Sequence, residues 1–136
     1  MPQETTPLPV VWRSSATEAD YEEARVGRVF NHRRPERFPL GIIEVTSEQQ
    51  IIEAVKLALK RKCRISIRAG GHSWAVWSVR DNAILLDFGK YHDIQFDERT
   101  GIAAVTPSTT GQILNGFLLT KGLMFAAGYG FPFCFL

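Results

Sequence analysis

The sequence predicts an α+β fold, built from a β-α-β unit, a following β-meander and a second helix. Two observations lead to this prediction. Short apolar runs typical of strands are interrupted by amphipathic segments with helical periodicity. The chain has 136 residues, of which 45% are hydrophobic and 22% charged, which suits one globular domain with a sizeable core.

The β-α-β unit begins with an apolar run at 41–45. Ser47 and Gln50 then form a capping box, which marks the first turn of a helix. The basic residues 60–62 complement the helix dipole at the other end, and a second strand follows at 64–68. One apolar face of this helix is expected to pack on the sheet: Ile51, Ile52, Val55, Ala58 and Leu59.

Three more strands are expected, at 83–87, 93–97 and 101–105. The last two are joined by a polar, glycine-containing turn, which predicts a hairpin. We expect these three runs to form the meander that follows the β-α-β unit. The second helix is predicted from about 110 to 121 and stops at Gly122, with its inward face formed by Ile113, Leu114, Phe117 and Leu118.

The N-terminal part is predicted to be a Pro-rich extended leader over 1–15 and an amphipathic helix over 16–30. The formal charge of +2 is no signal for nucleic acid, and the basic cluster at 32–34 is interrupted by Pro35 and Glu36. The first residues lack the basic and apolar regions of a signal peptide, and no run reaches the ~20 apolar residues of a membrane span. A cytoplasmic chain without a membrane span is therefore expected.

The histidines and cysteines do not predict a metal site. His32, His72 and His92 are scattered, and neither Cys63 nor Cys134 has a partner at metal-ligand spacing. Cys63 is expected to be a buried thiol.

The segment with the clearest chemistry follows the strand at 64–68 and consists of Arg68, Ala69, Gly70, Gly71, His72 and Ser73. Glycines allow positive φ and a close approach to a ligand, and successive backbone N–H groups can form a nest for a phosphate. Neutral histidine can act as a nucleophile near neutral pH. The turn therefore predicts a nucleotide cofactor. From these residues alone an ordinary turn remains open. A Rossmann site is not favoured, because G-x-G-x-x-G is absent.

The order of motifs resembles the N-terminal part of the FAD-binding domain of flavoprotein oxidases of the vanillyl-alcohol oxidase and p-cresol methylhydroxylase (PCMH) type. The berberine-bridge-enzyme-like oxidases are the most similar subgroup. The resemblance covers roughly residues 28–128. It depends on Arg34–Pro39, Ile65–Trp74, Ile84–Asp87, Val105–Pro107 and Gly122–Phe125.

The resemblance implies an FAD-dependent oxidoreductase that accepts hydride from a C–H bond of an alcohol, a sugar or a similar small molecule, with O2 as the electron acceptor. The backbone from Ala69 to Ser73 would bind the pyrophosphate of FAD. His72 stands at the position that commonly bonds to the 8α-methyl carbon of the flavin. Arg68 belongs to the same expected cofactor-binding segment, with a structural rather than a catalytic role.

The chain departs from the family after Gly128, where members continue with G-H-C-P-T-V-G or G-T-C-P-T-V-G. Tyr129 and Gly130 stand at the positions of the His or Thr and the Cys, and Cys134 is out of register. We therefore assign no second flavin link. We expect a leader and helix at 1–27, a partial FAD-binding domain at 28–128 and an aberrant apolar tail at 129–136, as in an interrupted family sequence that is inactive alone.

Three hypotheses follow for function. The chain is an N-terminal fragment of an FAD-dependent oxidoreductase, a non-catalytic FAD- or nucleotide-binding remnant, or an unrelated α+β interaction domain. Bound flavin would separate the third hypothesis from the first two. Substrate oxidation would separate the first from the second.

Overall fold

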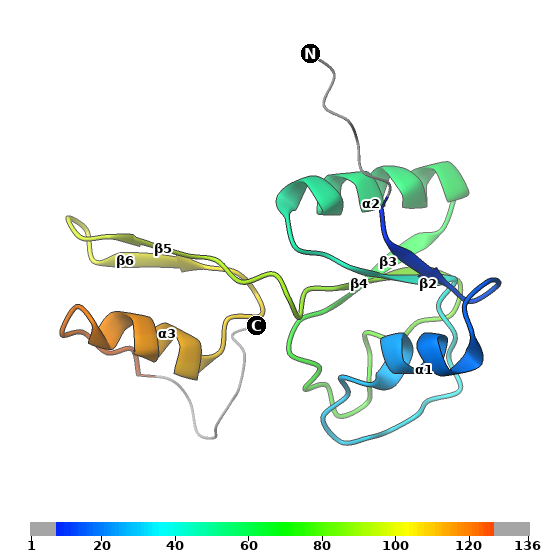
Figure 1. Cartoon of the computed structure of the whole chain (residues 1–136), viewed down its shortest axis with the longest axis horizontal. Coiled ribbons are helices and arrows are strands. Elements are labelled where there is room, and N and C mark those ends of the chain that lie inside the picture. Colours follow the sequence, from blue (N-terminus) through cyan, green and yellow to red (C-terminus); the bar gives the residue numbers. More distant parts are fainter. Residues whose placement is uncertain (1–7, 127–136) are drawn as a thin grey trace, which may run out of the picture.

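The elements of the chain divide into two parts that lie side by side (Figure 1). The computed structural model describes residues 8–126. We call residues 8–91 the sheet lobe and residues 93–126 the hairpin lobe. The sheet lobe contains β1 (Val10–Trp12), α1 (Glu18–Val26), β2 (Gly41–Glu44), α2 (Glu48–Arg61), β3 (Arg64–Arg68) and β4 (Ala83–Asp87). The hairpin lobe contains β5 (Ile94–Asp97), β6 (Ile102–Val105) and α3 (Gly111–Leu119).

The sheet lobe is organised around β4. The strand order is β1-β2-β4-β3, and β4 pairs in parallel with both β2 and β3, whereas β1 is antiparallel to β2. Helices α2 and α1 lie on opposite faces of this sheet (Figure 1). Ile43 and Leu86 belong to the core cluster under α2, and Ile42 and Leu85 belong to the cluster that contains Tyr21 of α1. Both faces of the central strands are therefore buried.

The β-α-β unit and the α+β class are confirmed, but the predicted meander is not formed as expected. The first of its three strands, β4, joins the parallel sheet, and only β5 and β6 form an antiparallel pair. The physical reason is burial. All five residues of β4 are buried, and a continuously apolar strand is stable only where both of its faces are covered.

Helix α2 begins and ends as predicted, but its buried face differs. Ser47 accepts from the Gln50 N–H at 3.3 Å, and Lys62 takes the left-handed conformation after the last turn. Ala54 and Ala58 are buried against the sheet, while three residues of the predicted face are exposed: Ile52, Val55 and Leu59. The buried face is centred on these two alanines, and Ile51 and Leu57 pack against the same core cluster.

The remaining helices are shorter than predicted. Helix α1 covers only part of the predicted segment 16–30, with Thr17 as its N-cap and Gly27 as its C-cap. Helix α3 lies within the predicted segment 110–121; Leu114 and Leu118 are buried as predicted, whereas Ile113 is exposed. No helix in the described part is long and apolar enough to cross a membrane.

Several sequence-based predictions concern parts of the chain that the structure leaves undescribed. The start of the leader, the tail at 129–136 and Cys134 lie outside the described residues. Cys63 is only partly buried, and its Sγ lies 3.8 Å from the Ala58 carbonyl oxygen.

Candidate functional site

The glycine turn at 69–73 lies where the sequence predicted it, directly after β3. Strands β2, β4 and β3 are parallel, so their carboxyl ends meet at the same edge of the sheet. Ligands of open α/β sheets bind at this edge. The turn is therefore placed where a cofactor can approach backbone groups.

Arg68, the last residue of β3, was expected in the cofactor-binding segment, and its side chain lies in the interior. Its side chain is buried and pairs with Asp87, the residue beside it on β4. Arg68 Nε and Nη2 donate to Asp87 Oδ2 at 3.1 and 2.6 Å. Nη1 and Nη2 also donate to the carbonyls of Arg25 and Ala24, each at 2.6 Å. This guanidinium joins β3, β4 and the end of α1, and its position does not favour contact with a ligand.

Arg28 is a second cation at the same carboxylate. Its Nη1 forms an ion pair with Asp87 Oδ1, and its Nη2 donates to the Ala69 carbonyl at 2.8 Å. Gly89 N also donates to Asp87 Oδ1, at 2.9 Å. Two guanidinium groups and one carboxylate leave one net positive charge beside the glycine turn. This charge favours an anionic ligand.

Gly71 is required by the packing of the turn. Its φ is +76°, and an added Cβ would lie 2.1 Å from the Arg28 carbonyl oxygen. The Phe30 N–H donates to the Gly71 carbonyl at 3.2 Å. Residues 28–30, which we call the strap, therefore lie directly against the turn and determine its shape.

The turn offers backbone donors. Within residues 8–126, the N–H groups of Gly70, Gly71 and Ser73 have no hydrogen-bond acceptor. There are thus three such donors within five consecutive residues, and a net positive charge lies beside them. This combination suits the binding of a phosphate or pyrophosphate. The residues present therefore fit the diphosphate part of a dinucleotide cofactor.

His72 is half-buried at the edge of these donors. The Phe30 ring meets it edge-on, with ring centroids 5.8 Å apart and an interplanar angle of 77°. The Phe30 ring also contacts the Trp74 ring edge-on, with ring centroids 5.2 Å apart and an interplanar angle of 88°. Ser73 contributes differently, because its Oγ accepts from the Trp77 N–H at 3.1 Å and so stabilises the next turn.

The loop that follows His72 is held in an unusual conformation. Val76 has a φ of +53°, which is rare for a β-branched residue, and its side chain is buried with three other valines. Arg37 Nη2 donates to the carbonyls of Ala75 and Val76 at 2.5 and 2.8 Å. Strained backbone of this kind persists only where its surroundings hold it, and it is concentrated at functional sites.

Sequence reasoning did not identify Arg28, Phe30 or Asp87 as site residues. Asp87 carried a signal, because a carboxylate that ends a wholly apolar strand is buried and needs a partner. Arg28 and Phe30 carried none, since their contacts with the turn join residues about 40 positions apart.

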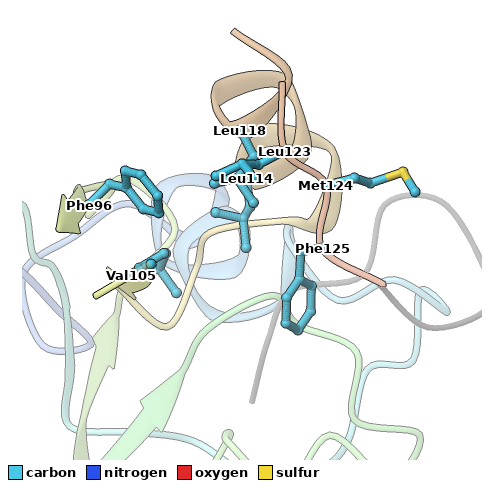
Figure 2. Close-up of a pocket in the computed structure, with 9 residues that line it drawn as sticks. Phe96, Val105, Leu114, Leu118, Leu123, Met124 and Phe125 are labelled. Carbon is cyan, nitrogen blue, oxygen red and sulfur yellow. The ribbon is translucent and has the colours of Figure 1, made fainter. Parts of the chain in front are cut away.

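A separate cavity of about 490 Å³ lies in the hairpin lobe. Phe96 and Val105 of the hairpin face Leu114 and Leu118 of α3, with Leu123 and Phe125 closing one side (Figure 2). Its walls are apolar and provide no acid, base or nucleophile. Nowhere in the described chain do three or more His, Cys, Asp or Glu residues form a group that suits a metal ion.

Comparison with known proteins gives a consistent result. Residues 39–134 match the family model described as FAD binding domain. The FAD-linked oxidoreductase nodO of Hypoxylon pulicicidum is 42% identical over 122 residues, which are 90% of this chain and 27% of that protein. The FAD-linked oxidoreductase janO of Penicillium janthinellum is 39% identical over the same shares. The chain thus spans about a quarter of the length of the curated relatives it matches.

A solved structure supports the fold. The carbohydrate oxidase from Microdochium nivale, in complex with a substrate analogue, superposes with a TM-score of 0.68 and 27% identity. The match covers 84% of this chain and 24% of that one. The glycine turn at the carboxyl edge of the parallel strands, its free backbone donors and these matches agree: the chain belongs to the FAD binding domain family.

Proposed function

We propose that residues 69–73 bind the pyrophosphate of FAD through their backbone N–H groups. The free donors of Gly70, Gly71 and Ser73 support this assignment, and so does the net positive charge that Arg28, Arg68 and Asp87 leave beside the turn. In this proposal Arg68 holds the turn in place and does not touch the cofactor. Oriented backbone donors need no reorganisation to bind an anion, which favours tight binding.

His72 forms one covalent bond to the 8α carbon of the flavin in this proposal. Its position beside the donors of Gly70, Gly71 and Ser73 supports this role, because an imidazole nitrogen can act as a nucleophile. Ser73 keeps its side chain for the following turn and contributes its backbone N–H.

The protein to which this sequence belongs is proposed to act as an FAD-dependent oxidoreductase on a small-molecule substrate, with dioxygen as the electron acceptor. FAD supplies the hydride-accepting ring when bound. The residues of this chain bind the diphosphate, anchor the flavin and orient it. The names of the relatives, FAD-linked oxidoreductases and a carbohydrate oxidase, support the reaction class.

The experiment is to express the complete reading frame in its native and His72→Ala forms and to measure flavin before and after acid precipitation. Native protein is expected to keep yellow, fluorescent flavin in the precipitate. His72→Ala is expected to release all of its flavin while still binding FAD reversibly. His92→Ala is the matched control, because His92 is exposed and lies after β4.

Two results would contradict the proposal. An acid-stable adduct in His72→Ala would place the attachment at another residue. If the native protein does not bind FAD, the assignment of FAD as the cofactor would be wrong. FAD retention without turnover of any alcohol or sugar would favour the alternative of a non-catalytic FAD-binding protein.

A further inference from the structure

The strap at 28–30 does more than fill space beside the glycine turn. Its backbone contacts Gly71 twice, through the Arg28 carbonyl and the Phe30 N–H. Two of its side chains contact the residues that flank the glycines in sequence. Arg28 donates a hydrogen bond to the carbonyl of Ala69, and the Phe30 ring contacts the ring of His72. One short segment thus holds the residue before the glycines and the residue after them.

We infer that Phe30 is a positioning residue that sets the orientation of the His72 imidazole for bond formation with the flavin. This inference rests on the proposed covalent attachment at His72. The Phe30 ring contacts two aromatic rings, at 77° to His72 and at 88° to Trp74. These two edge-to-face contacts, together with the backbone bond to Gly71, restrict rotation of Phe30 and give His72 a defined neighbour.

The orientation of the imidazole matters because the attachment step needs a nitrogen lone pair aimed at one carbon atom. His72 forms a C–N bond to the 8α carbon, while one C–H bond of that methyl group and the N–H bond of the imidazole are broken. The two electrons and two protons that are released pass to dioxygen, which becomes hydrogen peroxide. Rates of such steps depend steeply on how well the reacting atoms are aligned.

Phe30 is also well suited to this role by its exposure. It is 39% exposed, so it contributes little to the core of the sheet lobe. Removing its ring is therefore expected to leave the fold intact while it takes away one contact of the imidazole. A residue with a purely structural role would show the opposite pattern, with lost stability and unchanged attachment.

The test compares Phe30→Leu with Phe117→Leu in the product of the complete reading frame, prepared without flavin and then mixed with FAD. Phe117 has a similar edge-on partner, Phe96, at 6.3 Å in the hairpin lobe, so it undergoes the same chemical change far from His72. Covalent flavin is followed by fluorescence after denaturing electrophoresis, and reversible FAD binding is followed by quenching of flavin fluorescence.

Phe30→Leu is expected to slow covalent attachment by about tenfold, the size of one well-formed aromatic contact, while reversible FAD affinity changes less than about twofold. Phe30→Tyr, which keeps the ring, should restore the native rate, and Phe117→Leu should leave it unchanged. Equal rates in native protein and Phe30→Leu would overturn the inference. Absence of covalent flavin in the native protein would instead overturn the proposed attachment at His72.

Discussion

The sheet lobe and the hairpin lobe differ in how completely their elements are covered. In the sheet lobe, β4 is buried along its whole length between two parallel neighbours, and helices lie on both faces. In the hairpin lobe, one helix lies against a two-stranded hairpin and a cavity of about 490 Å³ remains between them. Large apolar side chains there are exposed, including Ile102, Leu119 and Met124.

The glycine turn at 69–73 is attached to the more completely covered of the two lobes. All clusters of buried apolar residues found in the described part of the chain belong to the sheet lobe. The packed strands hold the backbone of the attached turn in a fixed conformation. A preorganised anion site requires such a backbone. A two-stranded hairpin has little independent stability, so the hairpin lobe is a poor support for such a site.

The largest expected effect tests whether the lobes differ in packing. Leu86→Ala removes a fully covered side chain from the sheet core and is expected to cost about 3–5 kcal/mol of unfolding free energy. Leu118→Ala, at the wall of the open cavity, is expected to cost about 1–2 kcal/mol, because solvent and neighbours can fill the space. Urea titrations followed by circular dichroism measure both.

Tryptophan fluorescence sharpens this comparison, because all three tryptophans lie in the sheet lobe: Trp12, Trp74 and Trp77. If the lobes unfold separately, Leu118→Ala leaves the fluorescence transition in place while Leu86→Ala shifts it. Equal shifts for the two variants would show that the lobes unfold as one unit and would contradict the expected difference in packing between them.

A smaller effect is expected from alanine at a glycine of each lobe. Gly71→Ala forces a side chain into a positive-φ position against the Arg28 carbonyl and is expected to cost about 1–3 kcal/mol and to weaken FAD binding at least tenfold. Gly116→Ala is the matched control, since Gly116 lies inside α3 with open space around it. It is expected to stabilise the helix by about 0.5–1 kcal/mol. Thermal unfolding and FAD titration measure both, and an unchanged FAD affinity in Gly71→Ala would contradict the role of the turn.

The smallest effect concerns an ion pair of each lobe. In the sheet lobe, the hydrogen bond from Arg25, at 2.6 Å, lowers the pKa of Glu22 below its ordinary 4.5. A carboxyl with a lowered folded-state pKa stabilises the protein above its ordinary pKa, and this stabilisation is lost as pH falls through the folded-state value. Glu22→Gln should therefore reduce stability at pH 7 and flatten its decline below about pH 4.5.

The matched pair in the hairpin lobe is Glu98 with Lys121, whose Nζ lies 2.6 Å from Glu98 Oε1. The hydrogen bond from Lys121 lowers the pKa of Glu98. Glu98 is exposed to solvent, so screening removes most of the benefit. Glu98→Gln is expected to leave the pH profile of unfolding unchanged. A larger effect for Glu98→Gln than for Glu22→Gln would reverse the expected order of the two lobes.

The sequence by itself determined the local features of this protein. The capping residues of α2, the turn between β5 and β6, and the placement of Gly70, Gly71 and His72 after a strand follow from short-range preferences and from the spacing of apolar residues. The order of five short motifs along the chain was enough to indicate the FAD binding family, because each motif is contiguous in the sequence.

Only the tertiary structure decided where β4 inserts, which face of α2 is buried, and that Arg28, Phe30 and Asp87 lie beside the glycine turn at 69–73. The position of β4 depends on which neighbours can cover both of its faces, and an apolar pattern does not specify those neighbours. The strap meets the turn across about 40 residues of sequence, and such a contact is set by the folded arrangement of α1 and β3. The glycine turn is formed by neighbouring residues, whereas the residues that hold the turn in place are distant in the sequence.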